Sequence, residues 1–282
     1  MNHPKEAYGV LFKSVWETLR LFGRNRHVTP GMIAVLHTWG QTQCLHPHLH
    51  CIVPGGGMDK NGKWKPVRAN GKYLFPVKAL SKVFRAKYVS LLRKSPILST
   101  EDSKSCYKEI IESLFSKSWV VYAKRPFSHP SYVVEYLGRY THKIAISNHR
   151  LVSYSEGRVR FSYKDYRHGG SKKEIELDDT EFIRRFALHI LPAGFIRIRH
   201  YGILSSTSKK VTVPSIRKQL VDTPENNFTD MRKLQPFDRR LCPCCGNLSM
   251  ITVKTIPRGP PESTTCCLAY EMVETASQPS TS

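Results

Sequence analysis

The sequence is poor in acidic residues and has no long apolar run. Its 282 residues include 22 Asp and Glu against 44 Lys and Arg, which gives a formal net charge of +22 at pH 7. Such an excess calls for an anionic partner, and nucleic acid is the first candidate. No apolar stretch approaches the roughly 20 residues of a membrane-spanning helix, and the basic residues are spread along the chain. We therefore expect no membrane partner.

A secretory signal and a disulfide framework are not evident either. No apolar core follows the first charges of the chain, and the eight cysteines are scattered singly or crowded together. Such usage is typical of reduced thiols. We expect a cytoplasmic protein that associates with the nucleoid when it is bound to DNA.

The apolar pattern predicts one large domain with small appendages, because 40% of the residues are hydrophobic. Spacing and turn signals predict helices at 8–22, 77–93, 130–143 and 181–190, strands at 32–39, 48–53, 119–123 and 195–199, and a hairpin at 150–163. After about Leu220 the composition turns polar. We interpret 221–282 as a tail that is partly disordered.

Three histidines alternate along one predicted strand, in His46-Pro47-His48-Leu49-His50. Successive side chains of a strand point to opposite faces, so the three imidazoles would share one face. Two imidazoles and a third polar group can hold a divalent ion. Pro47 cannot donate a hydrogen bond to a neighbouring strand, which favours a strand that begins near His48. We therefore expect His48 and His50 to be the ligand pair. The alternative is a polar sheet face that holds no metal.

Two tyrosines, Tyr136 and Tyr140, lie four residues apart on a predicted helix, which makes them neighbours on one face. The alternative is that they pack at the edge of the core. A phenol with a pKa of about 10 is a poor nucleophile, but it can attack phosphorus when a metal neutralises the developing charge. Four basic residues could hold flanking phosphates or form a solvated face: Arg139, Lys143, Lys124 and Arg125.

The two patterns together resemble the two-tyrosine, HUH-type transposases of rolling-circle insertion sequences, where HUH denotes His, a hydrophobic residue, His. The matching stretches are His48-Leu49-His50, Tyr136-Leu137-Gly138-Arg139-Tyr140-Thr141-His142-Lys143 and the flanking segments 34–40 and 186–192. The histidines precede the tyrosines, as in the replication-initiator-like branch. The resemblance covers about residues 30–205.

This resemblance implies an α+β fold with an antiparallel central sheet and flanking helices, an HUH endonuclease core. The core would span 30–220 and follow an N-terminal helical segment, 1–29. The implied activity is nicking and rejoining of single-stranded DNA at transposon ends through a 5′-phosphotyrosine intermediate with a divalent ion. A phosphodiester substrate favours Mg²⁺ or Mn²⁺ as this ion, whereas the imidazole ligands by themselves favour zinc, copper or nickel.

Residue by residue, the resemblance makes His48 and His50 metal ligands, and Tyr136 and Tyr140 the nucleophiles. It leaves the third ligand open. His46 is a candidate from strand geometry, and a Gln or an acidic side chain from a neighbouring strand is an equal alternative.

The sequence departs from the family at both ends. Members usually carry an N-terminal cysteine-rich zinc module, and no cysteine precedes Cys44 here. One alternative is therefore an inactive truncated remnant that only binds nucleic acid. Another is a zinc hydrolase built on the three histidines, although no glutamate stands beside them as a general base. In the tail, Cys242 and Cys245 resemble half of a zinc ribbon, and the alternative is a pair of reduced, exposed thiols.

Overall fold

The computed structural model describes residues 3–66, 75–98, 103–124, 126–127, 130–141 and 144–221. The chain divides into two units, residues 1–226 and 227–282, and only the first is described below. Several predicted site residues lie outside the described residues: Arg125, Lys143, Cys242 and Cys245. The same is true of the Arg139 side chain, although its backbone is described. The boundary at 220 and the partly disordered tail stay predictions.

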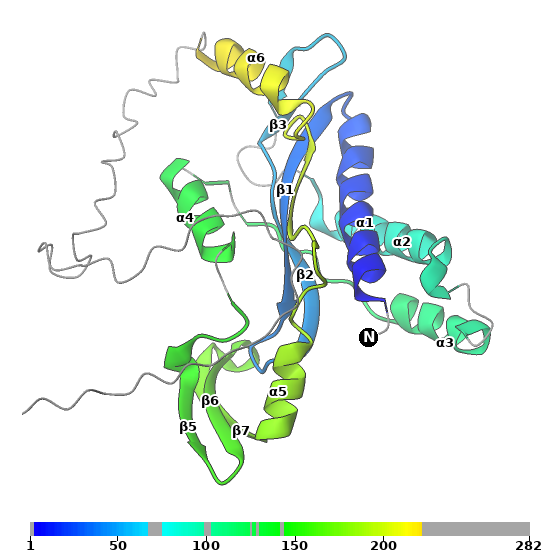
Figure 1. Ribbon diagram of the computed structural model, residues 1–282. Coiled ribbons are helices and arrows are strands. Elements are labelled where there is room, and N and C mark those ends of the chain that lie inside the picture. Colours follow the sequence, from blue (N-terminus) through cyan, green and yellow to red (C-terminus); the bar gives the residue numbers. More distant parts are fainter. Residues whose placement is uncertain are drawn as a thin grey trace, which may run out of the picture. The chain divides into compact units, whose positions relative to one another are not determined.

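One antiparallel sheet is built around strand β1 (Thr29–Trp39) (Figure 1). Strand β1 pairs with β2 (Leu45–Ile52), β3 (Gly56–Met58) and β8 (Ile198–Gly202), and β3 pairs in turn with β4 (Trp64–Pro66). Helices flank this sheet. The α+β class with an antiparallel sheet and flanking helices is therefore confirmed.

Alternation along β1 sorts its side chains onto two faces of the sheet. Met32, Ala34 and Leu36 are fully buried on one face. They form the main core with Tyr8 and Phe12 of helix α1 (Pro4–Arg24). His37 points to the opposite face, which is therefore available for a site.

Helix α1 has a proline in its first turn, where the missing N–H costs nothing, and an apolar stripe that meets the sheet. Helix α2 (Val77–Arg93) packs on α1, and α3 (Ser103–Ser116) follows the short 3₁₀ turn Pro96–Leu98. Figure 1 shows these three helices on one side of the sheet and α4 (Pro130–Thr141) on the other. No helix among the described residues is both long and apolar enough to cross a membrane.

A second, three-stranded sheet follows α4 in the chain. It consists of β5 (Leu151–Ser155), β6 (Arg158–Asp165) and β7 (Ser171–Asp178), with 3₁₀ turns at Asn148–Arg150 and Tyr166–His168. Its core of Ile146, Val159 and Phe161 is covered by Phe182 of helix α5 (Asp179–Ala187). The predicted hairpin is confirmed, and α6 (Lys209–Val221) ends the described chain. Neither β7 nor α6 was predicted.

The strand predicted at 119–123 is wrong, because this segment forms no strand. The Trp119 ring instead packs against Phe84 and Tyr88 of α2, with ring centroids 4.9 and 5.1 Å apart. Ser81 donates a hydrogen bond to the Trp119 carbonyl. The sequence pattern predicted that this segment pairs in a sheet, whereas the backbone and ring of Trp119 contact helix α2.

Three predicted boundaries also move. The strand expected at 195–199 is β8, displaced to Ile198–Gly202, and helix α5 begins and ends earlier than 181–190. Strand β2 begins at Leu45 and includes Pro47. Proline is tolerated there because β2 pairs only with β1 among the described strands, so its other edge needs no donor from Pro47.

Gly202 is the sheet glycine at which an added side chain would come closest to the backbone of another strand. Its φ is +60°, and an added Cβ would overlap the Pro30 carbonyl oxygen and lie 2.6 Å from the Trp16 ring. We expect Gly202→Ala to lower the free energy of unfolding by about 3 kcal/mol, measured by urea denaturation. Gly9→Ala in α1 is the matched control, because nothing lies within 4 Å of its added Cβ. It should raise stability by about 0.5–1 kcal/mol. Equal effects of the two changes would contradict the steric account.

Candidate metal centre and tyrosine pair

Three histidines from two strands meet on the sheet face opposite α1. In the β1–β2 register His37 lies opposite His48, and Val35 lies opposite His50. Cross-strand partners share a face, so the three rings project to the same side. Their ligand nitrogens all lie within 4.8 Å of one another. His37 is buried, and His48 and His50 are half-buried.

Hydrogen bonds fix which nitrogen of two rings carries the proton. His48 Nδ1 donates to the His46 carbonyl at 2.7 Å, and His37 Nε2 donates to the Tyr140 carbonyl at 2.8 Å. A carbonyl only accepts, so the lone pairs are left on His48 Nε2 and His37 Nδ1. Ligand histidines in metal sites are usually held in this way by a second partner. The set therefore fits a divalent ion.

His37 was missed by sequence reasoning, which left the third ligand open. His46 is exposed and does not belong to the group of three, although its ring centroid lies 5.0 Å from that of His48. The register of β1 against β2 selects His37 instead. The only sequence signal was a single imidazole near the end of a mostly apolar predicted strand.

Both tyrosines of helix α4 lie against the histidines. The ring centroids of Tyr136 and Tyr140 are 4.3 Å apart, and the Tyr140 ring lies 4.0 Å from the His50 ring. Tyr136 Oη is 3.2 Å from His50 Nδ1, within hydrogen-bond distance. The structure therefore brings together two motifs separated by 86 residues.

Burial raises the pKa of Tyr136 to about 12, and the neighbouring Tyr140 and Cys51 add to the increase. The phenol therefore stays protonated at neutral pH. Burial also raises the pKa of the Cys51 thiol to about 12, which makes that cysteine a poor nucleophile. A phenolate at Tyr136 needs a nearby cation to stabilise it.

The C-terminal end of α4 is tied to the sheet by two side chains. Arg197 Nη2 donates to the carbonyls of Tyr140 and Thr141 at 3.2 and 2.6 Å, and His37 donates to the first of these. A cation is favourable at this end because the carbonyls of the last turn carry partial negative charge. Arg197 also lies over the Trp39 ring, 5.9 Å from its centroid. These contacts fix where the tyrosines sit.

Of the predicted DNA contacts, the structure describes the side chain of Lys124 alone, which is exposed in the segment before α4. The same segment carries Phe127, whose ring lies 5.4 Å from that of Tyr136 and is 38% exposed. An exposed aromatic ring can stack on a base. The contacts predicted for Arg139, Lys143, Lys124 and Arg125 stay predictions.

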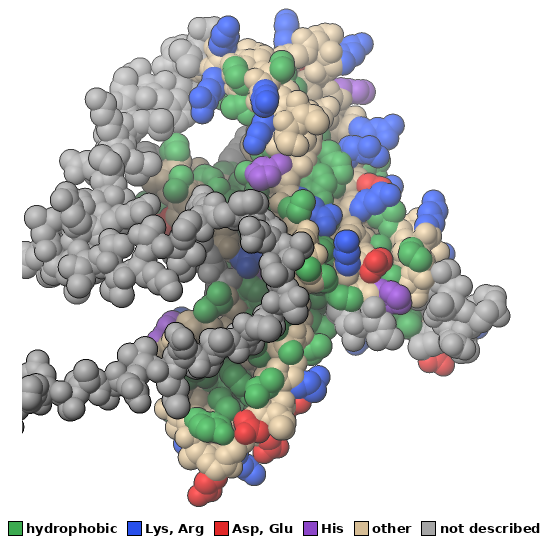
Figure 2. Space-filling view, viewed as in Figure 1, with side chains coloured by type: hydrophobic (Ala, Val, Ile, Leu, Met, Phe, Trp, Pro, Cys, Tyr) green, Lys and Arg blue, Asp and Glu red, His purple; other side chains and the backbone are tan. Residues whose placement is uncertain are grey.

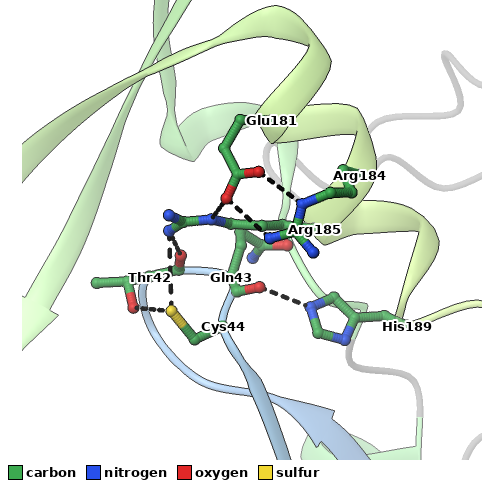
Figure 3. A network of polar contacts seen from close by, with 7 residues as sticks. All are labelled: Thr42, Gln43, Cys44, Glu181, Arg184, Arg185 and His189. Carbon is green, nitrogen blue, oxygen red and sulfur yellow. Dashed lines mark hydrogen bonds and ion pairs between the residues drawn. The ribbon is translucent and has the colours of Figure 1, made fainter. Parts of the chain in front are cut away.

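The turn between β1 and β2 is held by α5 and the residues after it (Figure 3). Arg185 donates to the Thr42 carbonyl and to Glu181, at 3.1 and 2.7 Å. His189 Nε2 donates to the carbonyl of buried Gln43 at 3.0 Å, and burial lowers the His189 pKa so that the ring stays neutral. This network stabilises the turn that sets the register of His37 against His48.

Comparisons with known proteins agree with one another. Residues 31–211 match the family model described as "Putative transposase". The chain is 38% identical over 279 residues to the "Putative transposase y4qJ" of Sinorhizobium fredii (strain NBRC 101917 / NGR234), covering 90% of this chain and 70% of that protein. It is 28% identical over 244 residues to the "Transposase for insertion sequence element IS801" of Pseudomonas savastanoi pv. phaseolicola, covering 82% of this chain and 59% of that protein. No solved structure matches.

The geometry predicts that His37 contributes to metal binding and that His46 does not. We expect His37→Ala and His48→Ala each to weaken Mn²⁺ binding at least about tenfold, measured by titration calorimetry, because each removes one nitrogen of the group. His46→Ala should leave the affinity within about twofold, the range of an exposed imidazole outside the group. A reversed order, with His46→Ala the damaging change, would show that the ion is held on the outer part of β2.

Proposed function

This chain belongs to the putative transposase family, and from that premise we propose that it nicks and rejoins single-stranded DNA at transposon ends through a covalent phosphotyrosine. The observation that carries the proposal is the meeting of two phenols with three imidazoles, with Tyr136 Oη 3.2 Å from His50 Nδ1. The HUH and rolling-circle character belongs to the same proposal.

In the proposed step, a tyrosine oxygen attacks the phosphorus of the scissile phosphodiester. The bond between phosphorus and the 3′-oxygen breaks, and the phenol proton ends on that oxygen. The 5′-phosphate is then joined to tyrosine, and the DNA end is a free 3′-hydroxyl. Because one phosphodiester replaces another, the reverse attack by a 3′-hydroxyl releases the phenol and joins strands without an external energy source.

The protein's own residues prepare this step. His37, His48 and His50 would hold Mg²⁺ or Mn²⁺, which supplies positive charge at the scissile phosphate and lowers the cost of forming a phenolate. Arg197 and His37 hold the last turn of α4 and so place Tyr140. Because the two tyrosine rings lie 4.3 Å apart, both phenols can reach one phosphate site in turn.

Removal of both phenol hydroxyls tests the nucleophiles. We expect Tyr136→Phe combined with Tyr140→Phe to abolish covalent adducts with 5′-labelled single-stranded DNA in the presence of Mn²⁺, resolved on denaturing gels. DNA binding should change less than about twofold, because the charged residues and rings remain. Tyr166→Phe, at an exposed tyrosine of the second sheet, is the matched control.

The result distinguishes three functions. Adducts that persist in the double variant would discard the tyrosine assignment. A wild-type protein that binds DNA but never forms an adduct would be the inactive remnant. Metal-dependent cleavage without any adduct would indicate a hydrolase.

Arg197 should act as a positioning residue for helix α4. We expect Arg197→Gln to slow adduct formation at saturating DNA about 10- to 100-fold, because small displacements of a nucleophile are costly. Arg197→Lys should recover part of the rate, since it keeps a cation near the helix end. Mn²⁺ affinity should stay near that of the wild type in both variants. A rate loss explained entirely by weaker metal binding or by unfolding would exclude the positioning role.

A further inference from the structure

A long stretch of the chain near the end of the first unit has no acidic residue. Between Glu181 and Asp222 the sequence has no Asp or Glu. The Lys and Arg residues of this stretch are Arg184, Arg185, Arg197, Arg199, Lys209, Lys210, Arg217 and Lys218. Half of them lie on α6, and the family match ends at residue 211, so α6 lies mostly outside it.

Helix α6 presents its cations on one side. Lys209, Lys210, Arg217 and Lys218 are all exposed, whereas Ile216, Gln219 and Leu220 are half-buried. At 100° per residue the four cations fall within half of the helix circumference. Figure 2 shows Lys and Arg side chains over α6, at the top of the view, with no acidic side chain visible among them.

The β3–β4 hairpin adds to this surface because α6 is tied to it. Gln219 Nε2 donates to the Gly62 carbonyl at 2.9 Å, and the backbone N–H of Trp64 donates to Gln219 Oε1 at 2.7 Å. These two hydrogen bonds hold the hairpin against the helix. We call the combined surface the basic patch; it consists of Lys60, Lys63, Lys65, Lys209, Lys210, Arg217 and Lys218.

The acid of this hairpin does not neutralise the patch. Asp59 has a side chain that is 8% exposed and is ion-paired with Lys65 at 3.3 Å. Its Oδ1 atom also accepts hydrogen bonds from the backbone of Asn61 and Lys63. The other six cations of the patch form no ion pair with a described residue, so they are available to an external anion.

The patch has charge but no exposed aromatic ring. Trp64 is half-buried, and it packs against Gly56. Exposed rings lie elsewhere, among them Tyr122 and Phe127 in the segment that precedes helix α4 and Tyr132 on that helix. Single-stranded DNA is held largely by stacking of bases on such rings, whereas duplex DNA presents regularly spaced phosphates that need only cations. The charge pattern therefore favours a duplex.

We propose that the basic patch binds the phosphate backbone of double-stranded DNA, as a second DNA-binding surface distinct from the tyrosine pair. It rests on the proposed function only in taking DNA as the partner. The charge argument holds whether or not Tyr136 and Tyr140 are nucleophiles.

The test is duplex binding by the full chain carrying Tyr136→Phe and Tyr140→Phe, without divalent metal, so that cleavage chemistry plays no part. In this background Lys209→Gln, Lys210→Gln, Arg217→Gln and Lys218→Gln are combined. The control removes the same charge from helix α2 and its C-cap, on the α1 side of the sheet (Figure 1), by Lys78→Gln, Lys82→Gln, Arg93→Gln and Lys94→Gln. Affinity is measured by fluorescence anisotropy over a salt series, with circular dichroism as the check on folding.

We expect the α6 variant to bind duplex DNA about tenfold or more weakly at 0.15 M salt, while the α2 control stays within about threefold. The slope of log affinity against log salt should become shallower by about 0.9 for each phosphate that the variant no longer neutralises, and so by about 3 to 4 units in total. Should the α6 variant fail to fold, Lys60→Gln with Lys63→Gln in the hairpin tests the same surface.

Three outcomes would overturn the proposal. The two quadruple variants could lose the same duplex affinity, which would mean that DNA responds to the net charge of the protein and not to the basic patch. The α6 variant could lose single-stranded rather than duplex affinity. It could also lose binding to phosphatidylserine vesicles while duplex binding is unchanged, which would identify a membrane surface. None of these results bears on covalent adduct formation by the wild-type protein, so this proposal and the tyrosine chemistry fail independently.

Discussion

The register of β1 against β2 is the constraint on which the site depends. It places His37 opposite His48 and Leu36 opposite Leu49, so that one face carries imidazoles and the other carries the core. A slip by one residue would turn His48 and His50 toward α1 and expose Leu49, which the burial of apolar surface forbids. The hydrophobic core and the candidate metal centre are therefore two consequences of one pairing. The turn at Gln43 and its contacts with α5 hold that pairing at its end.

His37 connects the histidines to the tyrosine helix. One of its nitrogens donates to the Tyr140 carbonyl, and the other belongs to the group of three. A cation held by that group would polarise the ring and strengthen the bond to the carbonyl, because charge-assisted hydrogen bonds are stronger than neutral ones. Metal binding at this group would therefore be coupled to the position of α4 through His37, and also through His50, whose Nδ1 lies 3.2 Å from Tyr136 Oη. His48 donates to a carbonyl of its own strand.

Local spacing predicted what is local and missed what depends on pairing. The spacing of His48 and His50 and the spacing of Tyr136 and Tyr140 can each be recognised within a short stretch of sequence. The structure places the two pairs together. The third histidine depends on a cross-strand register, which no short stretch contains. Strand β7 was missed because its alternation is carried by Ile175 and Leu177 alone among charged residues. The segment at Trp119 was misread because the Trp119 ring packs on helix α2, while Val120 and Tyr122 are exposed and enter no sheet.

The net charge of +22 indicates a nucleic-acid partner but does not indicate where that partner binds. The distribution of acidic residues indicates the binding surface. Around the second sheet, acids and arginines neutralise one another, as Glu176 does with Arg158 and Arg160. Cations held in such pairs would have to give up a carboxylate before they could contact a phosphate. Asp59 is the only acidic residue of α6 and the β3–β4 hairpin. Its side chain is buried, accepts hydrogen bonds from the backbone of Asn61 and Lys63, and pairs with Lys65. A polyanion therefore displaces counterions at that surface but carboxylate side chains at the second sheet, and the first of these costs far less.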